Sequence, residues 1–305
     1  MPKTRLSEPL PDPDEAAWIR DAEDDARAGL RTGTDHLAER TRPGIRRDRG
    51  NPLDEAVALR DHDLMNIVEQ AVRHRDCVLA YQPVVEARPP HRVVFHEGLI
   101  RVLDPTGRPI PAREFMPIVE TSEIGRELDC ASLSLGLKAL ERHPSLRLSV
   151  NMSARTAGYR RWMQILDRAL RRDSGIGPRL TLEISEPSIA AVPDLIRDFM
   201  ERVASRGVAF ALDDFGAGPT LLRALRDSLF DAVKIDARFI RGITSNQDNE
   251  ALVRAMTGIA HAFGMGLMAV GVESQSDTDF LAAMGVDCVQ GYGFGAPTLR
   301  PPWEN

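Results

Sequence analysis

Polar residues that could bind metal ions or phosphate end several short apolar segments of this sequence. Asn151 follows Leu-Ser-Val, Glu183 follows Leu-Thr-Leu, and the pair Asp213 and Asp214 follows Ala-Phe-Ala-Leu. Lys234 follows Ala-Val in the next segment of this kind. Taken singly, each acid is more often a helix cap or a surface charge, and a lone lysine is usually solvated. The repetition along the chain is what indicates a functional site.

With Glu97, which lies in an earlier apolar segment, the set contains four carboxylates and one amide. Gathered in one place, these groups would repel each other unless a cation neutralised them. Oxygen ligands without His or Cys favour Mg²⁺ or Mn²⁺ over zinc. Two divalent ions bridged by a shared carboxylate are typical of phosphodiester hydrolysis, in which Lys234 would hold the attacking water or stabilise anionic oxygens.

Short strands that alternate with helices must bring these residues together. The apolar segments predict strands at 78–85, 92–103, 146–152, 180–184, 208–213, 232–235, 266–272 and 288–292. After a first helix that begins near residue 61, helical periodicity predicts helices at 112–120, 126–141, 161–171, 192–205, 220–225, 249–263 and 277–284. Gly207 and Gly264 fall where two of these helices should stop.

This alternation predicts an α/β fold with a largely parallel sheet, because strand–helix–strand units cross over with one hand. About eight strands in some 240 residues fit a closed, TIM-like (β/α)8 barrel. An open, doubly wound sheet is the alternative, although no G-x-G-x-x-G follows the first strand. In a parallel barrel all carboxyl ends of the strands face one mouth, so the polar residues above should converge there.

Composition limits the remaining possibilities. The 305 residues are 43% hydrophobic with a net charge of −6, which suits a packed core and argues against binding of a DNA or RNA polymer. No apolar run approaches the roughly 20 residues of a membrane-spanning helix, and the first residues lack the order of a secretory signal. We therefore expect a cytoplasmic protein without membrane contacts. Cys77, Cys130 and Cys288 are too dispersed for a metal cluster or a disulfide framework.

Residues 1–60 differ from the rest, since they are highly charged and poor in large apolar residues. Such a composition predicts a polar, mostly disordered N-terminal arm before a domain that spans 61–305. A short helix at 14–27 is the alternative for part of this arm. The basic stretch at 42–49 is interpreted as a solvated linker rather than a nucleic-acid contact.

Over residues 61–297, the motifs in order resemble the EAL domain family, which hydrolyses the bacterial second messenger cyclic di-GMP to the linear dinucleotide pGpG. The matching stretches are Tyr-Gln-Pro-Val-Val at 81–85, Glu-Gly-Leu-Ile-Arg at 97–101, Phe-Met-Pro at 115–117, Asn-Met-Ser at 151–153, Glu-Ile-Ser-Glu at 183–186, Asp-Asp-Phe-Gly at 213–216, Lys-Ile-Asp at 234–236, and Gln-Gly-Tyr at 290–292 followed by Pro297. The resemblance implies a modified barrel with an antiparallel first strand, Mg²⁺ or Mn²⁺ as cofactor, cyclic di-GMP as ligand, and a homodimer.

The resemblance also implies roles for single residues. One ion would be held by Glu97, Asn151, Glu183 and Asp213, and Asp213 would bridge to a second ion held partly by Asp214. Lys234, Asp214 and Glu97 would serve catalysis, with Lys234 on the attacking water or the phosphate. The dinucleotide groove would be lined by Gln82, Leu99, Arg101, Asp236, Gln290 and Pro297. Glu186 would hold the loop after the aspartate pair.

Two departures from the family pattern bear on activity. The family's Ala-Glu-Gly-Val-Glu motif reads Ala-Val-Gly-Val-Glu at 269–273, so Val270 replaces a glutamate that works at the second ion and the water. Valine can neither ligate an ion nor take a proton, and Glu273 lies too far along to replace it. In the loop at 213–221, Ala217 and Leu221 lack hydroxyls and Pro219 lacks a backbone donor.

Three functions are therefore open. The first is a protein that binds cyclic di-GMP, or a protein partner, with weak or absent hydrolysis, and the departures favour it. The second is an active phosphodiesterase with one or two ions, the second bound weakly. The third is a protein-interaction module without nucleotide binding, which the retained groove residues Gln82, Arg101 and Asp236 oppose. No Gly-Gly-Asp-Glu-Phe stretch is present, so a cyclase is not expected.

Overall fold

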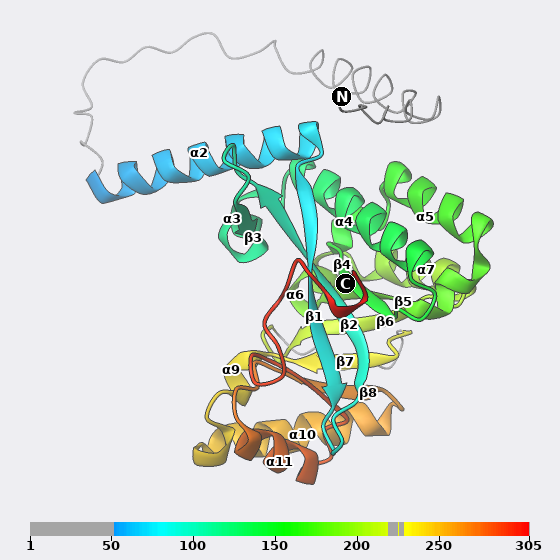
Figure 1. Cartoon of the computed structure of the whole chain (residues 1–305). Coiled ribbons are helices and arrows are strands. Elements are labelled where there is room, and N and C mark those ends of the chain that lie inside the picture. Colours follow the sequence, from blue (N-terminus) through cyan, green and yellow to red (C-terminus); the bar gives the residue numbers. More distant parts are fainter. Residues whose placement is uncertain (1–51, 219–224, 226–228, 305) are drawn as a thin grey trace, which may run out of the picture. The chain divides into compact units, whose positions relative to one another are not determined.

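A closed ring of strands is the centre of the structure. The computed structural model of the chain describes residues 52–218, 225 and 229–304. Within these residues, nine strands pair in the order β1-β9-β8-β7-β6-β5-β4-β2-β3, and a further pairing of β1 with β2 closes the ring. Because β3 pairs only with β2, eight strands form the barrel. Figure 1 shows the barrel strands with helices such as α4, α5 and α10 around them.

The direction of the strands confirms the predicted modified barrel and excludes the open, doubly wound alternative. Neighbouring strands from β2 through β4 to β9 are parallel, whereas β1 is antiparallel to both β2 and β9. The strands are β1 (Cys77–Glu86), β2 (Val93–Leu103), β3 (Pro109–Pro111), β4 (Leu148–Asn151), β5 (Leu180–Ser185), β6 (Ala209–Phe215), β7 (Ala232–Ile235), β8 (Gly266–Val270) and β9 (Cys288–Gln290).

The helices follow the predicted order, with three differences. They are α2 (Pro52–His74), α3 (Ala112–Val119), α4 (Glu123–Arg142), α5 (Arg160–Arg172), α6 (Glu186–Ala191), α7 (Pro193–Ala204), α9 (Ala237–Ile240), α10 (Gln247–Ala262) and α11 (Gln275–Ala283). Helix α2 starts nine residues before residue 61, where we placed the first helix. Helices α6 and α9 were not predicted, because four to six residues are too few to display helical periodicity.

Two predictions lie outside the described residues. They are residues 1–51 of the arm that we predicted over 1–60, and all but the last residue of the helix at 220–225. The prediction of a disordered arm is wrong for residues 52–60, which belong to helix α2. In the described part of the chain, no helix is long and apolar enough to cross a bilayer.

Both predicted helix stops are confirmed. Gly207 follows α7 with φ +83° and Gly264 follows α10 with φ +71°. This left-handed conformation costs a glycine little, and it turns the chain away from the helix toward the next strand. Strands β6 and β8 begin two residues after these glycines, so the glycines help to place the strands that carry Asp213 and Val270.

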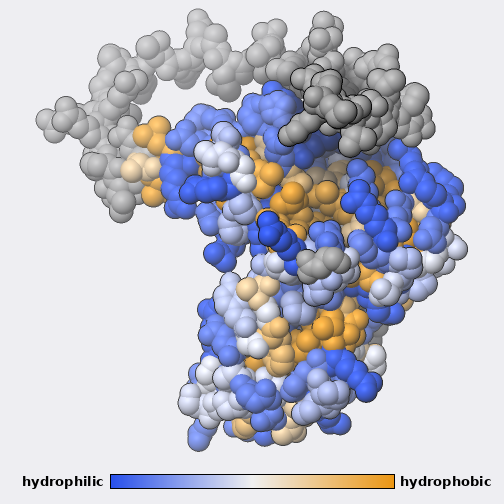
Figure 2. Space-filling model, in the orientation of Figure 1, coloured by the Kyte–Doolittle hydropathy of each residue, from blue (hydrophilic) through white to orange (hydrophobic). Residues whose placement is uncertain are grey.

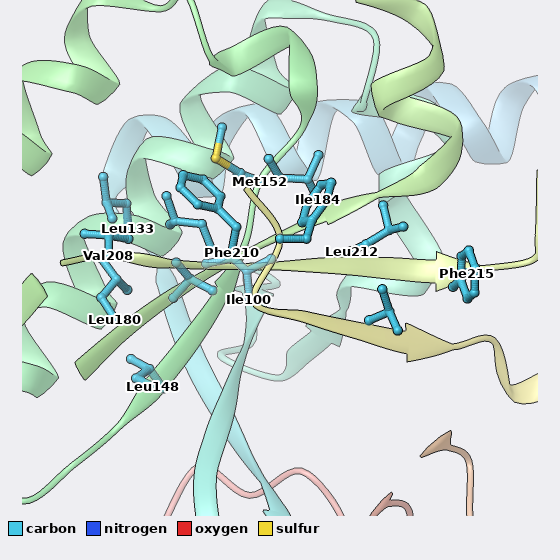
Figure 3. Packing of buried hydrophobic residues seen from close by; sticks show 14 of the residues in the cluster. Ile100, Leu133, Leu148, Met152, Leu180, Ile184, Val208, Phe210, Leu212 and Phe215 are labelled. Carbon is cyan, nitrogen blue, oxygen red and sulfur yellow. The ribbon is translucent and has the colours of Figure 1, made fainter. Parts of the chain in front are cut away.

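The main hydrophobic core lies between the outer face of the barrel and the helices. Figure 3 shows part of it, in which Leu133 of α4 and side chains of the strands such as Phe210 and Leu148 belong to one buried cluster. Helix α4 approaches β4 closely because Gly136 has no side chain, and a Cβ there would lie 2.9 Å from Val150 Cγ1. Helix α5 buries Trp162 and keeps its arginines outside, and its visible surface is hydrophilic in Figure 2.

The interior of the barrel is divided into a polar and an apolar layer. Alternate residues of a strand share a face, so the residue two positions before each site residue lies on the same inner face, one step deeper. On β4 and β5 these positions are the polar residues Ser149 and Thr181. On the other inner strands they are apolar, and together with Val84 of the antiparallel strand β1 they pack into one cluster, here called the apolar plug, which consists of Val84, Phe95, Ala211, Ala232, Met268 and Cys288.

Candidate functional site

Three acidic side chains from three strands meet inside the mouth of the barrel. Glu97 of β2, Glu183 of β5 and Asp213 of β6 each offer a carboxylate oxygen, and these oxygens all lie within 4.8 Å of one another. Glu97 and Glu183 are 5% and 1% exposed. The barrel brings these acids together as the sequence predicted. Glu183 and Asp213 lie near the carboxyl ends of β5 and β6, whereas Glu97 lies in the middle of the long strand β2, where β2 pairs with β4.

Lys234 of β7 occupies the middle of this cluster. Its Nζ lies 2.5 Å from Glu183 Oε2, 3.1 Å from Glu97 Oε2 and 3.5 Å from Asp213 Oδ1. The lysine is 2% exposed. A single ammonium therefore faces three carboxylates, which leaves an excess of negative charge in a site of low dielectric.

A row of amides holds Glu97 in place. Asn151 Nδ2 donates a hydrogen bond to Glu97 Oε1 (2.7 Å), and Gln290 Nε2 donates to Glu97 Oε2 (2.7 Å). Gln290 Nε2 also lies 3.3 Å from Gln82 Oε1, and Gln82 Nε2 donates to the carbonyl oxygen of Gly295 (3.1 Å). Asn151, Gln290 and Gln82 are thus brought into one network with the acidic cluster.

The pKa values reflect burial and crowding. Burial raises the pKa of Glu183 to about 8, and the Glu97 and Asp213 carboxylates add to the rise against the opposing effect of Lys234. Burial likewise raises the pKa of Asp213. For Glu97, burial is outweighed by Lys234 and by the amide hydrogen bonds, so its pKa is lowered. Burial acts to lower the pKa of Lys234, but the three carboxylates together raise it well above its ordinary value.

The residues present fit a divalent cation. Glu183 Oε1 is fully buried and has no hydrogen-bond partner among the described residues, and the same is true of Gln290 Oε1. A buried carboxylate oxygen without a partner is costly, and a cation would remove that cost. The donors are oxygens without sulfur or imidazole, which is the set that Mg²⁺ and Mn²⁺ prefer.

The two acids outside the cluster have structural contacts of their own. Asp214 has an exposed side chain and φ +54°, and its backbone N–H donates to Asp213 Oδ1 (3.0 Å). Asp236 caps α9 by accepting from the Arg238 backbone N–H (2.7 Å) and also pairs with the Arg238 guanidinium. Asp236 therefore acts at least in part as a helix cap, the role that a single acid at the end of a strand most often has.

Glu186 lies at the start of α6 and reaches the loop after β6. Its Oε2 accepts from the Gly216 backbone N–H (2.9 Å), which is the contact expected of a residue that holds this loop. Gly216 has φ +91°, and a Cβ there would lie 2.4 Å from Met256 Cε. The loop therefore needs glycine at this position.

The predicted groove residues lie along the rim. Leu99 and Arg101 follow Glu97 on the same face of β2, two and four residues further on. The Arg101 guanidinium is half-buried and donates to the carbonyl oxygen of Ile100 (2.9 Å). Pro297 immediately precedes Thr298, whose backbone N–H donates to the carbonyl oxygen of Tyr81 (3.0 Å), beside Gln82.

Val270 ends β8 at the same mouth. It pairs with Gln290 across the β8–β9 ladder, and its side chain is half-buried. Gly271 then turns the chain with φ +83°, and the side chain of Glu273 is exposed. Of the altered loop residues, Ala217 is described, while Pro219 and Leu221 lie outside the described residues.

Sequence reasoning missed two side chains that contact the loop after β4. Asp129 in α4 and Ser188 in α6 both accept hydrogen bonds from this loop. The signal for Asp129 was present, because it lies on the same helical face as Leu133, Leu137 and Leu140. An acid on an apolar helix face is seldom buried without a partner. Ser188 carried no comparable signal.

The fold and the site define a class of protein: a closed β/α barrel with a buried acidic cluster, suited to a divalent cation, at the carboxyl ends of its strands. The sequence model of the family described as "EAL domain" matches residues 65–297. The chain belongs to this family.

Relatives with assigned activities also match this chain. MucR of Pseudomonas aeruginosa, a bifunctional diguanylate cyclase/cyclic di-GMP phosphodiesterase, is 29% identical over 239 residues, which cover 77% of this chain and 35% of MucR. The cyclic di-GMP phosphodiesterase PdeR of Escherichia coli is 28% identical over 241 residues, covering 78% of this chain and 36% of PdeR. The chain thus spans about a third of the length of these relatives.

Solved structures agree with the fold. The structure described as PaMucR phosphodiesterase in a c-di-GMP complex matches with a TM-score of 0.68 at 27% identity, covering 77% of this chain and 97% of that one. The FimX EAL domain from Pseudomonas aeruginosa bound to c-di-GMP matches with a TM-score of 0.70 at 23% identity, covering 78% and 97%, and at this identity it supports the fold alone.

Proposed function

We propose that this chain binds cyclic di-GMP at the mouth of its barrel and hydrolyses it weakly or not at all, so that it acts as a receptor or regulator. One observation carries the proposal: the acidic cluster keeps its lysine, while the end of β8 carries Val270, where a carboxylate would be needed for the second ion. The relatives with phosphodiesterase activity support the choice of ligand.

The cluster supports binding of a phosphodiester through a cation. Glu97, Asn151, Glu183 and Asp213 would hold one Mg²⁺ or Mn²⁺ ion, and Asp213 with Asp214 would hold a second, weaker one. The chemistry that such ions supply when bound is neutralisation of the phosphodiester charge and activation of water. Lys234 adds a fixed positive charge to the same site, and Arg101 offers planar donors at the rim, which suit phosphate or a guanine edge.

Hydrolysis requires a group that takes the proton of the attacking water. Val270 has no oxygen for this task, and the loss of a positioned base typically costs on the order of 10²–10⁴ in rate. Glu273 does not replace it, because the chain turns at Gly271 and the Glu273 side chain is exposed. These observations support a site that binds cyclic di-GMP and hydrolyses it weakly or not at all.

An active phosphodiesterase is the second candidate. The observation that favours it is the intact contact of Lys234 with three carboxylates, since one ion and a lysine could still position and activate water. Under this candidate, Glu97→Ala abolishes a measurable wild-type rate. A module that binds only protein partners would have no use for the buried amides that surround Glu97.

The test is cyclic di-GMP turnover by the purified chain with Mg²⁺ and with Mn²⁺, beside a binding titration in Ca²⁺. We expect binding with little linear product. Val270→Glu should raise turnover by about 10² or more. Val270→Gln is the matched control, because glutamine has a similar size but cannot act as a base.

The outcomes separate the candidates. Steady product from the wild-type chain would make it an enzyme and refute the proposal. If Val270→Glu stays inert while it remains folded and binds Mn²⁺, the explanation by this single position is wrong. Neither binding nor product would favour the module that binds protein partners.

A further inference from the structure

The loop that follows β4 is held by a buried carboxylate from α4. Asp129 Oδ2 accepts hydrogen bonds from the Ser153 backbone N–H (2.9 Å) and from the Thr156 hydroxyl (2.6 Å). Asp129 is 5% exposed and Thr156 is fully buried. One carboxylate oxygen therefore ties two points of the loop to a helix that packs on the outside of the barrel.

The same loop is held from its other side by α6. Ser188 Oγ accepts from the Ala154 backbone N–H (2.8 Å). Asp129 and Ser188 thus satisfy the backbone N–H groups of two consecutive loop residues, 153 and 154. Backbone donors just after a strand have no partner in the sheet, so side chains that accept from them decide where the loop lies.

What this loop positions is Asn151. Strand β4 ends at Asn151, and only Met152 separates it from the residues that the two side chains hold. The Asn151 amide donates to Glu97 Oε1 (2.7 Å), so a shift of the loop would move both the amide and its partner carboxylate. Side chains that orient metal ligands in this way commonly determine affinity as strongly as some ligands do.

Helix α6 also contacts the loop after β6, on the other side of β5. Glu186 on the same helix accepts from the Gly216 N–H in the loop after β6, which carries Asp213 and Asp214. A six-residue helix therefore holds the loops on both sides of β5. The ends of β4 and β6, which carry Asn151 and Asp213, share one support.

We propose that Asp129 and Ser188 are positioning residues for Asn151, and that through Ser188 and Glu186 helix α6 fixes the β4 and β6 loops relative to each other at the cation site. The proposal deepens the proposed function and rests on it in one respect, namely that Asn151 ligates the cation. Burial raises the pKa of Asp129 to about 7, so the carboxylate is kept in this place at a cost that an apolar side chain would avoid.

Mn²⁺ affinity of the full chain tests the proposal, with the dissociation constant measured by electron paramagnetic resonance of free Mn²⁺. Ser188→Ala and Asp129→Ala each remove an acceptor and should weaken Mn²⁺ binding about 10-fold. Asp129→Asn keeps an acceptor oxygen and should bind Mn²⁺ within about twofold of wild type.

Asp287→Ala is the control. Asp287 accepts from the Leu267 backbone N–H (2.8 Å) at the opposite end of the barrel, so its loss removes a comparable hydrogen bond away from the site. It should lower the unfolding midpoint without changing Mn²⁺ affinity. If Asp129→Ala does not fold, Ser188→Ala decides the result alone.

Wild-type Mn²⁺ affinity in Ser188→Ala and in any folded Asp129→Ala would overturn the inference, as would a wild-type chain that does not bind Mn²⁺. A cyclic di-GMP titration keeps this result apart from the proposed function. Weakened Mn²⁺ binding in the variants of a chain that ignores cyclic di-GMP would uphold the positioning role and refute the ligand. If the chain binds cyclic di-GMP and the variants keep wild-type Mn²⁺ affinity, the ligand is upheld and the positioning role is refuted.

Discussion

Asp129→Asn should remove a pH dependence from the stability of the folded chain. In the native structure this carboxyl group is buried and accepts two hydrogen bonds through one oxygen, so its pKa rises from 3.8 to about 7. Asparagine can accept the same two hydrogen bonds but does not titrate. The substitution therefore separates the charge of Asp129 from its hydrogen bonding.

The sign follows from the raised pKa. The folded state binds the proton more tightly than the unfolded chain, so the stabilisation is complete below pH 3.8 and is lost as pH rises through about 7. Over that window the free energy of unfolding falls by about 1.4 kcal/mol per pH unit, or roughly 4 kcal/mol in total, from this group alone. Above pH 8 the contribution no longer changes.

Urea unfolding of wild type and Asp129→Asn at pH 5, 6, 7 and 8 measures the effect. The stability of the wild type relative to the variant should fall between pH 5 and 7 and then level off, with a constant offset from the asparagine NH₂ group. Parallel curves for wild type and Asp129→Asn would refute the raised pKa and the burial argument behind it.

Two further substitutions test the barrel mouth. Lys234→Met leaves the three carboxylates of the cluster without their ammonium, so without divalent ions the variant should lose about 3–5 kcal/mol of stability. Mn²⁺ should restore part of the loss. A melting scan with and without Mn²⁺ measures both effects, and an unchanged melting temperature would contradict the prediction. Gly291→Ala places a Cβ 1.9 Å from the Val272 carbonyl oxygen and should lower the free energy of unfolding by about 3 kcal/mol through overpacking. Denaturant unfolding measures this loss. A stability equal to that of wild type would show that the chain relaxes there at no cost.

The sequence was sufficient to predict the barrel because its signals are repeated. Eight apolar segments alternate with helices, and the predicted strand at 232–235 coincides with β7. Ends of other strands differ by one or two residues from the prediction, as at 266–272, where Gly271 ends β8. The antiparallel direction of β1 followed from the family resemblance, since periodicity carries no strand direction.

Site residues were predictable from the sequence where the residue type itself indicates the chemistry. They were not predictable where the role depends on contacts between distant segments. Glu183 and Asp213 could be found because they lie near the ends of apolar strands, and Glu97 because it is an acid within such a strand. The position of Lys234 between them could not, since it depends on how neighbouring strands are staggered in the closed ring. Ser188 stayed invisible, because a serine on a short helix acquires its role only from the loop that approaches it.

The apolar plug lies beneath the acidic cluster, so the cluster opens toward the mouth of the barrel. Val84, Ala211 and Met268 are buried and pack together beneath the acidic cluster, so we expect ions and water to exchange with the cluster through the mouth. A ligand that lies across the mouth would then cover whatever cation is beneath it. Entry and departure become ordered events, in which the cation enters first and leaves last. The signature would be cation exchange that slows as the mouth becomes saturated with ligand.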